Sequence, residues 1–347
     1  MTSSLPQAPP SPLRLRFDAD ALAANWRELA RMSAPAACGA AVKANGYGLG
    51  AKRVAQTLAE AGCRDFFVAT WAEAIELAPL GLDLSVLHGV FDEDMPAALE
   101  LSKAGLVRPV LNSLDQIARW RDAGGGECHV MVDTGMNRLG IAPEDIADGA
   151  LRGLTIDILM SHLACADEDV PMNGRQRDAF AALKGQTGAG RLSLANSAGI
   201  ALGPDYAFDL TRPGLALYGG VPCAELAHMR MVATPEARVI QRRTVRPGES
   251  IGYGATYVAA SNVEVAILHI GYADGYFRGF SNHGRAFAGD VALPVLGRVS
   301  MDLTAVDVTG VDVAEGDWVA LDYALPRAAA ASGMSQYELL TGLGGRF

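Results

Sequence analysis

Short apolar runs alternate with amphipathic stretches from Cys38 to Tyr218, and this rhythm constrains the fold more than any other feature of the 347-residue chain. The stretches between the runs, such as AKRVAQTLAEAG and SLDQIARWRDAG, have the apolar spacing of helices that cover a sheet. Strands that alternate with helices favour a parallel sheet, and eight such units predict a closed (β/α)8 barrel of the α/β class. The eight predicted strands lie at residues 38–43, 65–70, 84–90, 107–111, 128–133, 155–161, 192–196 and 208–212.

The rhythm changes after about Arg230. Segments such as ARVIQRRTV, SNVEVAILHI and DWVALDY are rich in β-forming residues and are separated by Gly, Pro and Asp, with no long helical pattern. We therefore expect a barrel over residues 13–230 and a β-rich domain over residues 231–347. Residues 1–12, MTSSLPQAPPSP, are rich in Ser and Pro and lack the apolar stretch of a secretory signal, so they predict a disordered tail.

Charge and cysteine content exclude several classes of protein. The net charge of -10 and a pI near 5.1 argue against a surface for nucleic acid or an anionic membrane, and no apolar run has the length of a membrane span. The five cysteines stand singly without CxxC spacing. Four histidines, His88, His129, His228 and His269, show no metal-ligand spacing. We therefore expect free thiols, no metal site and a cytoplasmic protein.

Polar side chains recur where the predicted barrel strands stop, which is where barrels of this class place their chemistry. Lys43 ends the first apolar strand and precedes the glycine-containing turn ANGYG. By itself it could be a lysine that reaches back to solvent, or a desolvated amine with a lowered pKa that suits Schiff-base formation. Arg212, by itself, could equally form a salt bridge at the barrel end. The other residues at strand ends are Arg138, His162, Asn196 and Ser197.

Eight motifs give the sequence a closer resemblance. AVKANGYGLG, VDTGMNRLG, SHLACADE, NSAG, LTRPGLALYGG, IGYGATY, GYADGY and GRVSMD occur in that order, and the match runs from about Leu13 to Leu343. In this order they resemble the alanine racemases, which bind pyridoxal phosphate in a barrel and carry a C-terminal β-domain. The resemblance implies an isomerase that interconverts L- and D-alanine, either to supply D-alanine as a peptidoglycan precursor or to break alanine down. It also implies that the first strand, at residues 13–18, joins the β-domain.

The resemblance further implies two opposed bases. Racemisation removes a proton from one face of the substrate Cα and delivers a proton to the other face, so one base is insufficient. Lys43 would hold pyridoxal phosphate as an imine and then act as one base, with Tyr253 as the other. His162 would hydrogen-bond Tyr253 and neighbour Arg212, which would face the pyridine nitrogen of the cofactor. Because arginine stays protonated, the ring nitrogen would remain unprotonated and act as a weaker electron sink, which suppresses transamination.

The remaining site residues also follow from the resemblance. Hydroxyls and backbone N–H groups at a Gly-containing turn suit the cofactor phosphate, which is a dianion. The planar fork of an arginine suits the substrate carboxylate. A homodimer whose two bases come from different chains is implied as well. The expected phosphate ligands are Tyr47, Ser197, Gly214 and Leu215, and the expected substrate ligands are Arg138, Met301 through its backbone N–H, Asp302 and Tyr272.

Two positions depart from the pattern of the family. Some members carry a carbamylated lysine two residues before the aspartate of VDTG, where this chain has Met131. A thioether cannot hold Arg138 by charge. The family tyrosine that contacts the phosphate near the C-terminus also lacks a clear match, because YELLTGLGGRF places Gly345 at about that position.

Parts of the sequence are also compatible with other functions. A barrel decarboxylase would need a different phosphate-binding glycine run, which the sequence lacks. A broad-specificity amino-acid racemase is an alternative, although such enzymes are typically exported and contain disulfides. A non-catalytic carrier of pyridoxal phosphate would have the barrel lysine but no β-domain, and hence no Tyr253. A cofactor-free barrel hydrolase would leave Lys43 and Arg212 unexplained.

Overall fold

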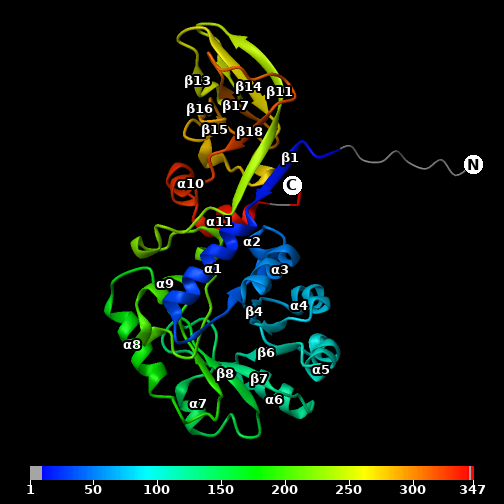
Figure 1. Ribbon diagram of the computed structural model, residues 1–347, viewed down its shortest axis with the longest axis vertical. Coiled ribbons are helices and arrows are strands. Elements are labelled where there is room, and N and C mark those ends of the chain that lie inside the picture. The colour runs from blue at the N-terminus through cyan, green and yellow to red at the C-terminus, as the bar shows by residue number, and fades with distance from the viewer. Residues whose placement is uncertain (1–9, 344) are drawn as a thin grey trace, which may run out of the picture. The chain divides into compact units, whose positions relative to one another are not determined.

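The computed structural model describes residues 10–343 and 345–347, so most of the predicted tail lies outside the described residues. The described chain divides into two compact units (Figure 1). One, the barrel unit, is Ala19–Val232, and the other, the β unit, combines the segment up to Asp18 with Ala233–Phe347.

The barrel unit is a ring of parallel strands. Parallel pairing runs without interruption from β3 to β9, and β10 pairs in parallel with β2. The N–H groups of Asp209 and Arg212 donate to the carbonyls of Leu192 and Ala195 at 3.0 and 2.8 Å, which joins β10 to β9 and closes the ring. The predicted parallel α/β barrel is thereby confirmed. Its strands are β2 (Ala37–Cys38), β3 (Ala40–Ala41), β4 (Asp65–Val68), β5 (Asp83–Val86), β6 (Val107–Leu111), β7 (Cys128–Met131), β8 (Ile156–Met160), β9 (Arg191–Ser193) and β10 (Leu210–Thr211).

The first predicted strand differs from the observed one. It is divided into β2 and β3 at Gly39, where a Cβ atom would lie 2.8 Å from the carbonyl oxygen of Asp65 on the neighbouring strand. Several other strands end earlier than their apolar runs, because the runs continue into buried loop residues such as Val132, which follows β7.

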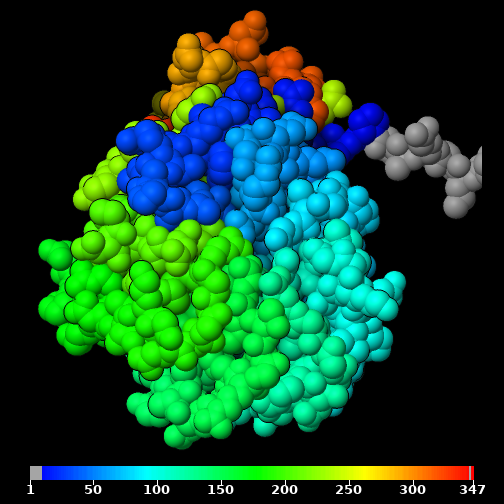
Figure 2. All heavy atoms as spheres, turned by 60° about the horizontal axis from the view of Figure 1, so that its bottom comes forward, coloured from blue at the N-terminus to red at the C-terminus, as the bar shows by residue number. Residues whose placement is uncertain are grey.

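Helices cover the outside of the ring of strands (Figure 1), and the space-filling view shows the residues of the barrel unit closely packed over the visible face (Figure 2). The helix α1 begins just after β1 (Leu13–Phe17), the strand that precedes the barrel unit, and it buries Leu22, Trp26 and Leu29. The helices are α1 (Ala19–Ser33), α2 (Lys43–Tyr47), α3 (Ala51–Ala61), α4 (Trp71–Leu77), α5 (Met95–Lys103), α6 (Leu114–Asp122), α7 (Pro143–Ala147), α8 (Pro171–Ala181) and α9 (Ser197–Ala201), and the 3-10 turn η4 is Leu215–Tyr218.

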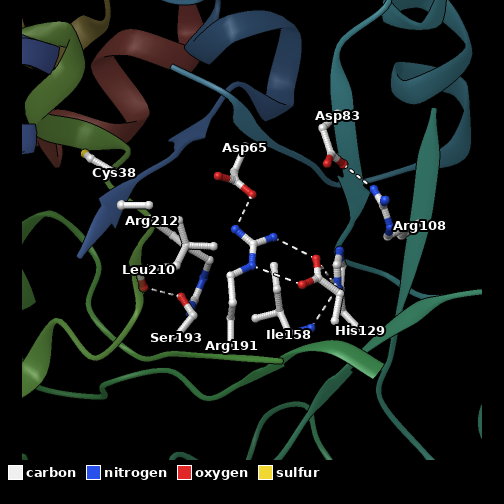
Figure 3. A network of polar contacts seen from close by, with 12 residues as sticks. Cys38, Asp65, Asp83, Arg108, His129, Ile158, Arg191, Ser193, Leu210 and Arg212 are labelled. Carbon is white, nitrogen blue, oxygen red and sulfur yellow. Dashed lines mark hydrogen bonds and ion pairs between the residues drawn. The ribbon is translucent and has the colours of Figure 1, made fainter. Parts of the chain in front are cut away.

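The barrel interior has an apolar and a charged part. An apolar cluster joins six residues of β4, β6, β7, β8 and β10: Phe67, Val110, Met131, Ile158, Met160 and Leu210. At the amino ends of the strands, Arg191 donates to Asp65 at 2.8 Å and to Asp157 at 2.7 Å, so it connects β9 with β4 and β8 (Figure 3). Charges at this end of a barrel generally serve stability, whereas chemistry lies at the carboxyl ends.

The β unit is a seven-stranded antiparallel sheet with two short helices. Its strand order is β16-β15-β18-β11-β14-β17, and β1 (Leu13–Phe17) pairs with β11 from Leu13 opposite Ala237 to Phe17 opposite Ala233. The two helices were not expected from the sequence. The other elements are β11 (Ala233–Val245), β12 (Ser250–Ile251), β13 (Tyr257–Val258), β14 (Val263–Leu268), β15 (Arg285–Ala288), β16 (Val291–Pro294), β17 (Thr304–Asp307), β18 (Trp318–Leu321), α10 (Leu325–Ser332) and α11 (Gln336–Gly342).

Two further properties concern the described residues as a whole. None of the helices they form is both long enough and apolar enough to cross a membrane. All five cysteines are free thiols.

Candidate active site

Lys43 stands where the chain leaves the sheet and enters a left-handed turn. The hydrogen-bond ladder between β3 and β4 extends to Val42, whose N–H donates to the carbonyl of Phe67 at 2.9 Å. Residues 44–47 then have positive φ angles, 53° at Ala44, 54° at Asn45, 62° at Gly46 and 55° at Tyr47. For residues other than glycine this conformation costs roughly 1–2 kcal/mol each. It persists only where the surroundings determine it, and such strain gathers at functional sites.

The Lys43 amine is in a cationic environment. The residue is half-buried, and burial lowers its pKa from the usual lysine value; Arg138 and Arg212 lower it further, while Glu73 raises it. A lowered pKa leaves more of the amine unprotonated at neutral pH, and the unprotonated amine is the nucleophile in Schiff-base formation. Of the two interpretations of Lys43 left open by the sequence, this environment favours the desolvated amine.

Arg212 is buried at the end of β10 without a carboxylate partner among residues 10–343 and 345–347. One Nη atom donates to the carbonyl of Ser161 at 2.6 Å, and the other donates to the hydroxyl of Ser193, beside which it lies in Figure 3. Burial lowers the pKa of Arg212 to about 10, so it still carries its charge at neutral pH. A buried cation that is unpaired in the protein is costly, and its position suits a polar or anionic ligand.

His162 follows β8 and is neutral in this environment. Burial is the main cause that lowers its pKa to about 3, and the charges of Arg212, Arg138 and Lys43 act in the same direction. Gln176 of α8 fixes the backbone here, because its side-chain amide donates to the carbonyl of His162 at 3.0 Å and accepts from the N–H of Ala164 at 2.8 Å. These electrostatic interactions place His162, Lys43 and the two arginines in one region.

The residues expected to bind phosphate form one cluster. The hydroxyl of Ser197 accepts from the N–H groups of Gly214 and Ala216 at 3.0 and 3.2 Å. Tyr47 stacks on Tyr218 with ring centroids 4.5 Å apart. A Cβ atom at position 214 would lie only 2.2 Å from Tyr47 Oη, so this close approach requires glycine. Leu215 begins the η4 turn, and the first N–H groups of a helical turn have no partner within it.

Arg138 is exposed on the loop after β7, and Asp133 shapes that loop. The two carboxylate oxygens of Asp133 accept from the N–H groups of Gly135, Met136 and Arg138 at 2.7, 2.9 and 3.2 Å. Met131 packs in the apolar cluster of the barrel. This is the position where some members of the resembled family carry a carbamylated lysine. The thioether of Met131 therefore belongs to the core.

In the β unit, two loops bring Tyr272, Met301 and Asp302 together. The N–H of Tyr272 donates to the carbonyl of Ser300 at 3.0 Å, and the N–H of Ala273 donates to that of Met301 at 3.0 Å. Asp302 pairs with Arg346 at 2.6 Å.

Tyr253 lies on a separate turn of the β unit, and its side chain is among the most exposed large ones, at 73 %. Gly345, where the resemblance expects a tyrosine, has open space around the position of a Cβ atom.

Sequence reasoning missed three residues that organise the site. Glu73 bonds the N–H of Ala44, Gln176 holds the loop of His162, and Arg346 pairs with both Asp302 and the fully buried Asp274. Only Glu73 had a local signal, because Thr70 and Glu73 have the spacing of a helix capping box. The capping motif predicts the start of α4 but not the bond to Ala44.

The fold and the site define a class of barrel enzyme with a lysine at the end of its first barrel strand and an antiparallel β unit after the barrel. Comparison with known proteins identifies the family. Residues 17–222 match the family described as alanine racemase, N-terminal domain, and residues 232–347 match alanine racemase, C-terminal domain. The chain therefore belongs to the alanine racemase family of isomerases.

Similar proteins agree over the full length. An alanine racemase of Dinoroseobacter shibae is 44% identical over 96% of both chains, and a biosynthetic alanine racemase of Agrobacterium fabrum is 40% identical over 97% of this chain and 93% of its own. Among solved structures, the alanine racemase of Bartonella henselae with covalently bound pyridoxal phosphate has a TM-score of 0.87 and 34% identity, and the match covers 98% of this chain and 99% of that one.

Proposed function

We propose that the chain interconverts L- and D-alanine with pyridoxal phosphate held on Lys43, and that Lys43 and Tyr253 are the two bases. The observation that carries this proposal is the amine of Lys43, half-buried at the end of a barrel strand with its pKa lowered by burial and by two arginines. Membership of the alanine racemase family supports the activity, and the pyridoxal phosphate bound covalently in the Bartonella henselae relative supports the cofactor.

The residues of the barrel unit fit this cofactor. Pyridoxal phosphate is an anion, and two cations, Arg138 and Arg212, act on the Lys43 amine; Arg212 is buried and has no carboxylate partner among the described residues. Tyr47, Ser197, Gly214 and Leu215 would hold the phosphate with two hydroxyls and backbone N–H groups. When bound, the cofactor withdraws electrons from the substrate Cα and so acidifies its hydrogen. Arg212 donates hydrogen bonds without losing its proton, which limits this electron withdrawal.

The two bases would act on opposite faces of the substrate. The amine of Lys43 takes up a proton readily once it is unprotonated, which its lowered pKa favours. To act as a base, the phenol of Tyr253 must first give up its proton. A neutral His162, with a pKa of about 3, can accept a hydrogen bond from that phenol.

Binding of the substrate carboxylate would combine Arg138 with the loops of Tyr272, Met301 and Asp302. The N–H of Met301 has no hydrogen-bond partner within the part of the chain that the structure describes, so it is available to an anion. An arginine and a free backbone N–H suit a carboxylate.

We further propose a homodimer in which each site takes Lys43 from one chain and Tyr253 from the other. The exposure of Tyr253, at 73 %, and of Met301, at 52 %, supports an arrangement in which a second chain covers these residues. We also assign the enzyme to the cytoplasm, because free thiols suit a reducing compartment. We assign it to D-alanine biosynthesis because the Agrobacterium fabrum relative is a biosynthetic alanine racemase.

Chemical trapping tests the position of the cofactor. Borohydride reduction of the loaded enzyme followed by peptide mapping should place the pyridoxyl group on Lys43. Finding the group on Lys103 or Lys184 would show that the site assignment is wrong. Racemisation measured over a panel of amino acids then distinguishes an alanine racemase from a broad-specificity enzyme, and a carrier protein would racemise none of them.

A further inference from the structure

Glu73 connects the turn that carries Lys43 to the end of the neighbouring strand. Its Oε1 accepts from the N–H of Ala44 at 2.6 Å, and its Oε2 accepts from the N–H groups of Ala69 and Thr70 at 2.7 and 3.2 Å. The three donors lie in two segments that are far apart in the sequence. One carboxylate therefore ties together the residues that follow β3 and those that follow β4.

The position of this carboxylate continues the sheet. The hydrogen bond from the N–H of Val42 to the carbonyl of Phe67, at 2.9 Å, joins the ends of β3 and β4. Beyond it the two segments diverge, one into the left-handed turn and the other into α4. The carboxylate of Glu73 accepts from the N–H groups of Ala44 and Ala69, each two residues beyond the pair that this last backbone bond joins. Hydrogen bonds between N–H groups and a carboxylate are stronger than those between neutral groups, so the connection is firm.

The turn needs such a connection because its conformation is strained. Ala44, Asn45 and Tyr47 all have positive φ angles, which side chains other than glycine rarely adopt. Ala44 is the first of them, and the bond to Glu73 fixes its N–H. The side-chain oxygen of Asn45 accepts from the N–H of Ala51 at 2.9 Å and holds the far side of the turn.

Glu73 also supplies negative charge to the region of Lys43. The charged and titratable groups that affect the Lys43 amine or are affected by it are Glu73, Arg138, Arg212 and His162. Glu73 is the acidic group among these, and it raises the pKa of Lys43 while burial and the arginines lower it. Its loss would therefore change both the geometry and the basicity of the amine.

We propose that Glu73 is a positioning residue of the racemase, whose carboxylate holds the strained Lys43 turn against the ends of β4 and α4. The proposal rests on the proposed role of Lys43 as the cofactor-bearing base. Glu73 acts through the backbone of Ala44.

The Glu73→Gln variant provides the test. An amide has one acceptor and one donor group, so it cannot accept from N–H groups on both sides as the carboxylate does. Competitive acetylation of the full-length chain after removal of the cofactor, followed by peptide mass spectrometry, gives the pH midpoint for Lys43, with the exposed Lys184 as internal reference. We expect the midpoint of Lys43 to move to lower pH because a nearby negative charge is lost. Affinity for pyridoxal phosphate, measured by its absorption, should fall about tenfold.

Thr70→Ala is the matched control. It removes the hydroxyl that caps α4 at 3.3 Å from the N–H of Glu73 and leaves the carboxylate in place. We expect a lower melting temperature with an unchanged Lys43 midpoint and cofactor affinity. The proposal is overturned if Glu73→Gln changes neither the midpoint nor the affinity, or if Thr70→Ala reproduces both changes. Because the acetylation midpoint does not depend on where the cofactor binds, it separates failure of this proposal from failure of the Lys43 assignment by borohydride trapping.

Discussion

Arg212 shows at the scale of one residue how the site departs from what stability alone would favour. Its guanidinium is buried, its pKa is lowered to about 10 by burial, and it has two oxygen partners but no carboxylate among the described residues. A group selected for stability would be paired or replaced by an apolar side chain. An unpaired buried cation is better explained by a ligand, which the proposed function supplies.

Gly214 gives a prediction at the same scale. Its φ angle is -130°, outside the positive range that favours glycine, so the Gly214→Ala variant tests the contact that an added Cβ atom makes. The added Cβ would meet Tyr47 Oη at 2.2 Å and displace the tyrosine from the proposed phosphate site. We expect affinity for pyridoxal phosphate to fall by about tenfold or more, and the free energy of unfolding to fall by about 1–3 kcal/mol. Absorption titration and urea unfolding measure these two quantities.

Gly174 offers the matched control for this substitution. It lies within α8, where nothing approaches the position of a Cβ atom within 4 Å. Gly174→Ala should raise the free energy of unfolding by about 0.5–1 kcal/mol, since alanine favours a helix, and should leave cofactor affinity unchanged. Equal cofactor affinity in the two variants would contradict the role given to Gly214.

Residues at strand ends could be predicted from the sequence, and residues that support them could not. Lys43 and Arg212 stand out because a charged side chain ends an apolar run, which is a local pattern. Glu73 and Gln176 act through hydrogen bonds to residues 29 and 14 positions away. Such pairings depend on how the helices pack on the barrel, and no spacing rule within the sequence indicates them.

At the scale of elements, strong periodicity predicts the barrel, whereas a single capping signal is too weak to predict a short helix. The resemblance implies a strand at residues 13–18, and β1 lies there, at Leu13–Phe17, and pairs with β11; the helix α1, which begins at Ala19, was not predicted. The helix α11 has a capping box formed by Ser335 and Glu338, a signal that is visible in the sequence. The surrounding segments are rich in β-forming residues, so the sequence favours strands over this short helix. The left-handed turn of α2 could not be predicted, since alanine and tyrosine there oppose their own backbone preferences.

At the scale of the whole molecule, buried His129 should make the free energy of unfolding depend on pH. It is buried in the barrel, and its Nδ1 accepts from the N–H of Ile158 at 3.2 Å, so it must be neutral. Burial lowers its pKa to about 3; Arg108, Arg191 and Arg212 also lower it, and Asp157 opposes them. Unfolding lets His129 take up a proton below about pH 6.5. Its stabilising contribution is therefore complete above that pH and is lost as the pH falls towards 3.

The His129→Asn variant measures this contribution. Asparagine can offer an acceptor oxygen in the place of Nδ1 but does not titrate, so its stability at pH 7 should be lower because of the lost ring. Between about pH 6 and pH 4, however, its free energy of unfolding should fall less steeply than that of the wild type, by up to about 1.4 kcal/mol per pH unit. Urea unfolding at a series of pH values gives both slopes. Parallel curves would mean that His129 is not held neutral by the fold.

The central claim is that Lys43 and Tyr253 are the two bases of one site shared between chains, and mixing two inactive variants tests it most directly. Lys43→Ala keeps Tyr253, and Tyr253→Phe keeps Lys43, so each homodimer lacks one base at every site and should be nearly inactive. A mixed dimer restores both bases at one of its two sites. Refolding equal amounts together should recover about half the wild-type activity per mixed dimer, or about a quarter of the total if pairing is random. Verified exchange of chains without recovered racemisation would contradict the shared two-base site.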